Sequence, residues 1–149
     1  MKTPIKLPAI TIFALLTIFT SCSKDDELLL NDANIPTAVK SYVETHFGSN
    51  SIIRAEKDTG NNTITYEIYL SENINLEFNS EFDIIDIDGI LQLPNSVIPQ
   101  SILNYVSTNY PNNFIRDWEL ELNHQQVELN NNVELEFETN GNFIRIDND

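Results

Sequence analysis

Carboxylates are the side chains whose number and spacing in this chain could do chemistry. The 149 residues include 23 Asp and Glu against eight Lys and Arg, a formal net charge of −15. In several segments acidic residues alternate with apolar ones, so in strands they would share one face of a sheet. The side chains assigned to this acidic face are Glu67, Tyr69, Glu77, Glu119, Glu121, Glu128, Glu134 and Glu136.

Two interpretations of this acidic face are open. It could bind a basic protein or a cationic ligand, because complementary charge orients partners. It could also be the solvated side of an antiparallel sheet that is covered on its other side, which is the simpler explanation. Like charges on neighbouring strands repel each other, and such clustering keeps the binding hypothesis open. Tyr69, out of phase with the core positions, is the candidate for an exposed aromatic contact. Nucleic acid is excluded as a partner, because phosphates are bound mainly through Lys and Arg.

The segment DIIDIDG, residues 83–89, lacks the spacing of an EF-hand calcium loop. A loop built around Gly89 would need an acid at Ile84 and a Glu at Asn95. Weak cation binding by Asp86 and Asp88 is the remaining alternative.

Histidine, cysteine and serine offer no recognisable catalytic or metal-binding arrangement. His46 and His124 fall in unrelated places, no Ser lies in a GxSxG setting, and Cys22 is the only cysteine. Zinc and thiol chemistry therefore lack ligands and a nucleophile. We expect a protein that is not an enzyme and that uses no cofactor and no metal.

The N-terminus has the features of an export signal. Lys2 and Lys6 precede an apolar run over residues 9–20, which has secretory-signal length and is short for a membrane span. The sequence FTSC, residues 19–22, resembles the lipobox of bacterial lipoproteins, although Phe19 departs from the usual Leu. We predict a lipoprotein signal peptide over residues 1–21 and lipid attachment at Cys22. An ordinary signal peptide with a chance cysteine is the alternative.

These features predict an exported protein that lipid holds to the bacterial outer membrane, either periplasmic or surface-exposed. Residues 22–33 are predicted to be the lipidated cysteine and a polar tether. The run SKDDE after Cys22 resembles the acidic surface-export signal of some lipoproteins. A lone cysteine cannot form an internal disulfide, which favours lipidation as its role.

Two helices with the same start signal and the same apolar stripe are predicted. They begin near Pro36 and near Pro99, because proline suits the first turn of a helix. Their stripes consist of Ile35, Val39, Tyr42, Val43 and Phe47, and of Ile98, Ile102, Tyr105, Val106 and Tyr110. This agreement indicates an internal repeat.

Each helix is followed by segments that alternate apolar and polar residues, as strands do. The predicted strands are 52–57, 63–70, 73–78 and 82–87, then 115–122, 125–129, 133–138 and 142–146. Their short connections require antiparallel neighbours. Alternation places Ile64, Trp118, Leu120 and Leu122 on the face under the helices, with the other apolar strand residues. Phe82 aligns with Gly141 of the second half. The hairpin that contains Phe82 is therefore expected to turn differently from the hairpin that contains Gly141.

The motifs IP…YV…F/Y, YEIYL…INLEF and VELNNNVELEFETNGNFIRID make the chain similar to a known family. It resembles the PepSY-like, beta-lactamase-inhibitor-protein-like family of small secreted bacterial proteins over residues 34–149. The resemblance implies an α+β fold of two tandem repeats, 34–92 and 93–149, each a helix followed by a four-stranded antiparallel sheet. It implies no catalytic residues. The expected function is a non-catalytic binding module of the cell envelope that uses the acidic face or an inter-repeat groove. A protease- or beta-lactamase-inhibitor-like module is the alternative.

Overall fold

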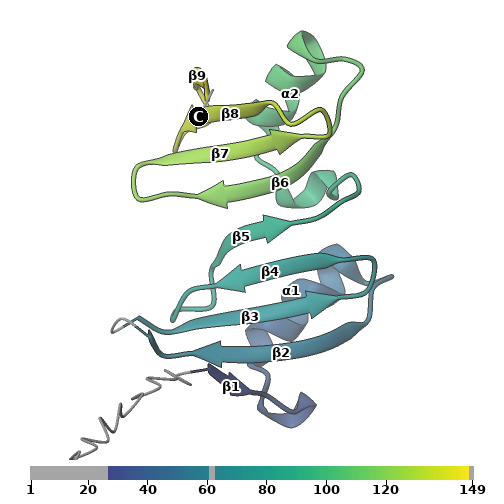
Figure 1. Cartoon of the computed structure of the whole chain (residues 1–149), viewed down its shortest axis with the longest axis vertical. Helices are drawn as coiled ribbons and strands as arrows, with labels where there is room; N and C mark the ends of the chain where they lie inside the picture. The colour runs from purple at the N-terminus through teal and green to yellow at the C-terminus, as the bar shows by residue number, and fades with distance from the viewer. Residues whose placement is uncertain (1–26, 61–62, 148–149) are drawn as a thin grey trace, which may run out of the picture.

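A single antiparallel sheet with two helices on one of its faces makes up the computed structural model, which describes residues 27–60 and 63–147 (Figure 1). The elements are β1 (Glu27–Leu29), η1 (Asp32–Asn34), α1 (Thr37–Phe47), β2 (Ile52–Asp58), β3 (Thr65–Leu70), β4 (Ile74–Phe78), β5 (Ile84–Asp88), η3 (Asn95–Val97), α2 (Gln100–Asn109), β6 (Ile115–Leu120), β7 (His124–Leu129), β8 (Glu134–Glu138) and β9 (Phe143–Asp147). The nine described strands lie side by side in chain order. The predicted α+β class and antiparallel pairing are confirmed.

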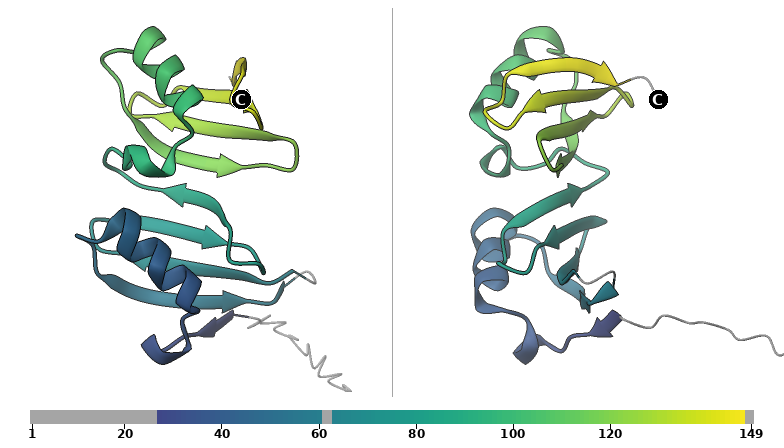
Figure 2. Two further views of the ribbon diagram at one scale, coloured as in Figure 1. Left: turned by 180° about the vertical axis from the view of Figure 1, so that it is seen from behind. Right: turned by 90° about the vertical axis from the view of Figure 1, so that its left-hand side faces the viewer.

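Both helices begin directly after a proline. Pro36 and Pro99 have φ −55° with extended ψ, and the next residue of each is helical. The proline ring fixes φ near this value, so each proline supports the start of its helix. The backbone carbonyl of Pro36 accepts a hydrogen bond from Lys40 (3.1 Å), and that of Pro99 accepts one from Leu103 (3.1 Å). Figure 2 shows that α1 and α2 lie on the same face, so no helix of the described residues covers the opposite face.

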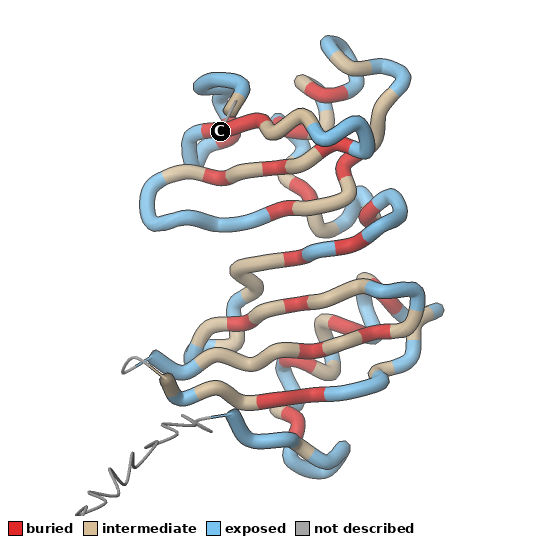
Figure 3. The backbone as a smooth tube through the Cα atoms, viewed as in Figure 1, coloured by how far each residue is buried: buried red, intermediate tan, exposed pale blue. Residues whose placement is uncertain are grey.

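The core lies between the helices and the sheet. Its largest fully buried side chains include Phe47, Phe78, Phe137, Ile68, Leu76, Ile87, Ile102, Leu129 and Leu135. Buried and less buried residues alternate along β7 and over the second halves of β3 and β4, as expected for a sheet covered on one side (Figure 3). Tyr42 meets Phe78 edge-to-face at 5.3 Å, and Tyr105 meets Phe137 in the same way at 5.4 Å. Corresponding helix residues therefore contact corresponding strand residues in the two halves.

The prediction that Trp118 is a core residue is confirmed, since it is buried. The prediction for Leu120 and Leu122 was wrong, since they are 40% and 103% exposed. Leu120 is in phase with Trp118 but is the last residue of β6, and Leu122 lies beyond the end of the strand. Ile64 is also exposed, because it precedes the first residue of β3. Alternation assigns a face only as far as a strand continues.

The hairpin between β4 and β5 uses the same backbone geometry as the one between β8 and β9, contrary to expectation. Phe82 has φ 68° and Gly141 has φ 86°. Left-handed φ is unfavourable for a bulky residue. In the first hairpin the side-chain oxygen of Asn79 accepts hydrogen bonds from the backbone N–H groups of Glu81 (3.0 Å) and Asp83 (2.9 Å). These bonds, and the contact of the Phe82 ring with Tyr66, hold the turn.

Part of the predicted tether belongs to the sheet. Glu27–Leu29 form β1, which pairs with β2, and the backbone N–H of Leu30 donates to the carbonyl of Ala55 at 2.8 Å. Leu30 packs against the core, which accounts for the departure of this segment from a polar tether.

The two halves are joined within the sheet by β5 and β6. Their register pairs Asp86 with Glu119, Ile87 with Trp118 and Asp88 with Asp117. Ile87 and Trp118 are both buried, so the core continues across this seam. The opposite face of the same seam carries the four acidic residues.

Candidate binding surface

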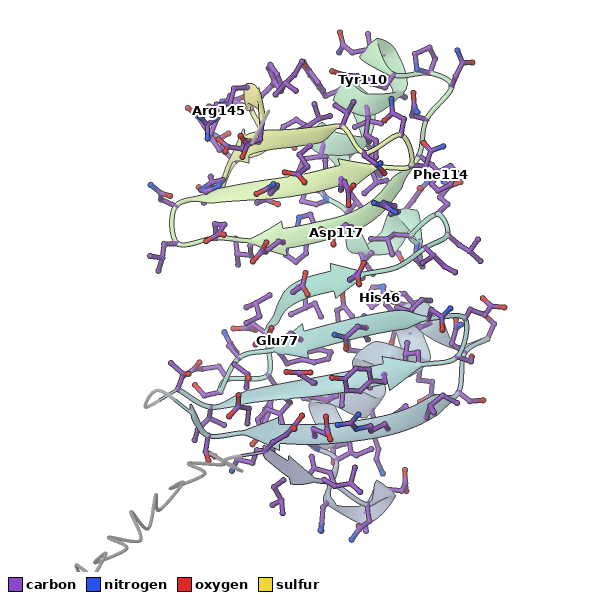
Figure 4. The ribbon with its side chains drawn as sticks, viewed as in Figure 1. His46, Glu77, Tyr110, Phe114, Asp117 and Arg145 are labelled. Carbon is purple, nitrogen blue, oxygen red and sulfur yellow. The ribbon has the colours of Figure 1, made fainter. Side chains whose placement is uncertain are left out.

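The residues predicted to form the acidic face lie on the sheet face that the helices leave open. Glu67 and Tyr69 lie on β3, Glu77 on β4, Glu119 on β6, Glu128 on β7, Glu134 and Glu136 on β8, and Glu121 just beyond β6. Figure 4 looks onto this face and shows Glu77 and Asp117 on either side of β5. The structure places the predicted carboxylates opposite charged or polar residues of the neighbouring strands. Some of them face other carboxylates, and others face arginine or glutamine.

Four carboxylates stand directly opposite one another on consecutive strands. Glu67 pairs with Glu77, Glu77 with Asp86, and Asp86 with Glu119. Neighbouring strands are about 4.8 Å apart, so these charges repel one another at short range. Within the described part of the chain none of the four forms an ion pair with Lys or Arg. We call Glu67, Glu77, Asp86 and Glu119 the acidic row.

Beyond each end of the acidic row, the register reaches a carboxylate that is paired with an arginine. Beyond Glu67, the register continues to Glu56, whose carboxylate is paired with Arg54. Beyond Glu119 it continues through Gln126 to Glu136 and then to Arg145. The negative charge of the row is therefore concentrated in the middle of the sheet, across the seam.

Glu136 is held by Arg145, which donates two hydrogen bonds to its carboxylate at 2.8 and 2.6 Å. This pairing lowers the pKa of Glu136, and the residue is only 8% exposed. Its carboxylate therefore offers little negative charge to a partner.

A second line of carboxylates crosses the seam beside the acidic row. Asp88 stands opposite Asp117, and Asp117 opposite Glu128. Burial, and then repulsion from neighbouring carboxylates, raises the pKa of both Asp86 and Asp117 to about 7. Burial also raises the pKa of Glu77 and of Glu119. A proton or a cation bound at the seam would therefore reduce the repulsion between these carboxylates.

Three other predicted residues are engaged within the face. Arg116 donates to Glu128 at 2.6 Å, and Gln126 donates to Glu134 at 2.8 Å. The Tyr69 hydroxyl donates to Glu67, which raises the pKa of Tyr69 to about 12. The guanidinium of Arg54 lies 5.0 Å from the centre of the Tyr69 ring. Tyr69 is therefore partly covered and less open to a partner than expected.

Sequence reasoning did not assign Glu56 or Asp117 to this surface and gave Asp86 only a weak cation role. Asp117 alternates with Glu119 in the printed sequence, so periodicity could have found it. Asp86 lies opposite Glu119, which only the pairing of β5 with β6 reveals.

A hollow of about 650 Å³ lies on the second unit, where the segment between the halves meets α2. Its lining includes Gln92, Asn95, Asn104, Leu103, Val106 and Phe114, and none of its lining residues is charged. The hollow therefore differs in chemistry from the open face, where the charge is gathered.

The predicted signal peptide, residues 1–21, and the predicted lipid attachment at Cys22 lie outside the described residues. In the part of the chain that is described, no helix has both the length and the apolar character needed to cross a membrane.

The sequence model of a proposed beta-lactamase-inhibitor-like, PepSY-like family matches the chain twice, over residues 22–86 and 89–145. The chain belongs to this PepSY-like family. The two matches divide the chain at the seam between β5 and β6, in agreement with the internal repeat read from the helices. No curated protein matches the sequence.

Three solved structures from Bacteroides share this fold. The first, from Bacteroides thetaiotaomicron and described as a proposed calcium-regulated periplasmic protein, is 26% identical, with a TM-score of 0.79 over 83% of this chain and 98% of that one. A proposed periplasmic protein from Bacteroides vulgatus is 27% identical, with a TM-score of 0.78 over 84% and 99% of the two chains. Another, of unknown function and from the same species, is 26% identical, with a TM-score of 0.77 over 82% and 99%.

Proposed function

We propose that this PepSY-like protein is an exported, lipid-anchored binding module of the bacterial cell envelope that does no catalysis. Its acidic row is the binding surface for a basic protein partner. Export is supported by the periplasmic description of the structural neighbours. The proposed organisation is a signal peptide over 1–21, a lipidated Cys22 with its linking segment to residue 33, and two repeats of a helix followed by four strands over 34–92 and 93–149. Lipid on Cys22 would hold the protein at the outer membrane, periplasmic or surface-exposed.

The observation that carries this proposal is that Glu67, Glu77, Asp86 and Glu119 lie together on the open sheet face and form no ion pair with a described Lys or Arg. Like charges directly opposite each other destabilise a sheet. The second half of the same register reduces this repulsion with Gln126 and Arg145, so the fold can be built without it. A Lys- or Arg-rich surface docked on the row would supply the missing countercharge, and it would also raise the rate of association.

The test removes charge from the row without changing side-chain shape. Glu77→Gln, Asp86→Asn and Glu119→Gln are combined in one variant, which is used beside the wild type to capture partners from envelope extract. We expect the captured basic protein to be lost or strongly reduced, and wild-type capture to weaken as salt is raised.

The matched control carries the same three-charge change away from the row. Glu44→Gln lies on α1, and Glu72→Gln and Asp83→Asn lie in exposed turns. If the row variant retains every partner that the wild type and control retain, the proposed surface is wrong.

An inhibitor-like function is the alternative, and the description of the family as beta-lactamase-inhibitor-like favours it. The purified protein would then reduce the activity of a secreted protease or a beta-lactamase in a concentration-dependent way. Absence of inhibition at micromolar protein across both enzyme classes would count against this alternative and would leave the acidic-row proposal intact.

A further inference from the structure

Glu27, Glu56 and Glu67 form a second carboxylate group at the edge of the sheet where β1, β2 and β3 meet. One carboxylate oxygen from each lies within 4.8 Å of those of the other two. In the described ranges this is the one group of three or more Asp, Glu, His or Cys side chains with metal-binding spacing. The three residues come from three different strands, so the fold itself has assembled them.

Glu56 has a buried carboxylate oxygen that no described residue hydrogen-bonds. The residue is 4% exposed, and its Oε1 accepts a hydrogen bond from Arg54. Its Oε2 is also buried and has no hydrogen-bond partner among residues 27–60 and 63–147. A buried carboxylate oxygen without a donor is unfavourable, because it has lost its hydrogen bonds to water and forms no other hydrogen bond.

The position of Glu27 also favours a positively charged ligand beside Glu56. A carboxylate oxygen of Glu27 lies within 4.8 Å of one of Glu56, so two like charges stand close together. Arg54 pairs with both carboxylates and offsets one of their charges, so a further cation would stabilise the group. The Glu56 oxygen and the neighbouring Glu27 are therefore poised for a positive ligand.

The charge balance indicates a divalent ion. Glu27, Glu56 and Glu67 contribute three negative charges, and Arg54 contributes one positive charge at 3.6 Å from Glu27. Arg54 is itself held over the ring of Tyr69, 5.0 Å from its centre. A net charge of −2 remains, which one divalent cation neutralises.

We propose that Glu27, Glu56 and Glu67 bind a divalent cation of the calcium class. All the protein ligands are carboxylate oxygens, which suit hard cations, and the group contains no His or Cys to favour zinc. Calcium accepts irregular geometry and completes its shell with water. Glu27 lies on the exposed edge strand, where water can reach the ion.

This site would fasten β1 to the rest of the sheet. β1 pairs with β2 over only three residues, so few backbone hydrogen bonds hold it. It also begins five positions after Cys22, the predicted lipid attachment. A cation shared by Glu27 on β1, Glu56 on β2 and Glu67 on β3 would join the segment nearest the membrane anchor to the folded domain. The site shares Glu67 with the acidic row, whereas Glu27 and Glu56 lie outside the row, so variants of these two residues test the cation site without changing the row.

The experiment titrates CaCl2 into the purified protein by calorimetry, in parallel with hydrogen exchange at the β1 amides. We expect wild type to bind one calcium ion per chain and to show slower exchange in β1 when calcium is present. Glu56→Gln should weaken calcium binding by about tenfold or more, because affinity follows the number of charged ligands. Glu27→Gln changes an exposed side chain, so it tests the site even if Glu56→Gln fails to fold.

The control is Glu44→Gln, which removes one negative charge from an exposed position on α1. It should leave both the calcium affinity and the exchange of β1 unchanged. Three results would each overturn the site: no binding at millimolar calcium, equal affinities for the wild type and Glu27→Gln, or an equal loss in Glu44→Gln. The last two would identify only adventitious binding to an acidic protein.

Discussion

Replacing Asp86 by Asn should stabilise the protein at alkaline pH. The pKa of Asp86 is raised from 3.8 to about 7, first by burial and then by Glu119, Glu77 and Asp88. A raised carboxyl pKa means that the folded state binds the proton more tightly than the unfolded state. The stability associated with this group is therefore fully present below pH 3.8, and it is lost as the pH rises through about 7.

The magnitude follows from the size of the pKa change. A rise of about three pKa units corresponds to about 4 kcal/mol, at 1.36 kcal/mol per unit. Asp86 is only partly buried, so solvent screening reduces this by about half, to about 2 kcal/mol. Asparagine keeps the shape of the side chain and removes the charge. We expect Asp86→Asn to raise the free energy of unfolding by about 2 kcal/mol at pH 8 and by much less at pH 4.

Urea denaturation at pH 4, 6 and 8 measures this difference, with the fluorescence of Trp118 as the signal, since it is the only tryptophan. Asp83→Asn, in the exposed turn before β5, is the matched control and should leave the pH dependence of the wild type unchanged. If Asp86→Asn lowers stability at pH 8, or loses as much stability as wild type between pH 4 and pH 8, repulsion at the seam is not what destabilises the protein.

Three further predictions address the second half and the anchor. Gly141→Ala should lower the free energy of unfolding by about 2–4 kcal/mol in urea, because φ is 86° and the new Cβ would lie 1.8 Å from Ser101 Oγ; an unchanged midpoint would contradict this. Gln125→Ala should cost about 1–3 kcal/mol, since the buried Trp118 indole N–H donates to Gln125 at 3.0 Å and would lose its acceptor; an unaltered Trp118 emission and midpoint would refute it. Cys22→Ala should move the protein from the membrane fraction to the soluble fraction, and retention at the membrane would remove lipid attachment from the proposal.

The elements of this fold could be predicted closely because their signals are local. Val39, Val43 and Phe47 recur at helical spacing and are buried on α1, and Ile102 and Val106 do the same on α2. The eight strands that were predicted begin and end within two residues of their predicted bounds, because alternation and turn residues act over short stretches. The resemblance to the family then supplied the arrangement of these elements as two tandem repeats.

The failures came where a local pattern gave the wrong extent of a strand or the wrong expectation for a turn. Leu122 continues the alternation of β6, yet it lies beyond the last paired residue and is exposed. The segment around Leu28 looked like a linker, yet it pairs with β2. Phe82 lacks the turn chemistry of glycine, and the neighbouring side chain of Asn79 supports the same backbone shape.

The sequence by itself determined the composition of the open face: its periodicity places Glu67, Glu77 and Glu119 on the side away from the core. Only the tertiary structure decided which of those charges face each other. Cross-strand register brings Asp86 between Glu77 and Glu119 and pairs Glu136 with Arg145. It also gathers Glu27, Glu56 and Glu67 from three strands. The physical reason is that periodicity is a property of neighbours along the chain, whereas electrostatic repulsion and cation binding depend on distances between strands that lie far apart in sequence.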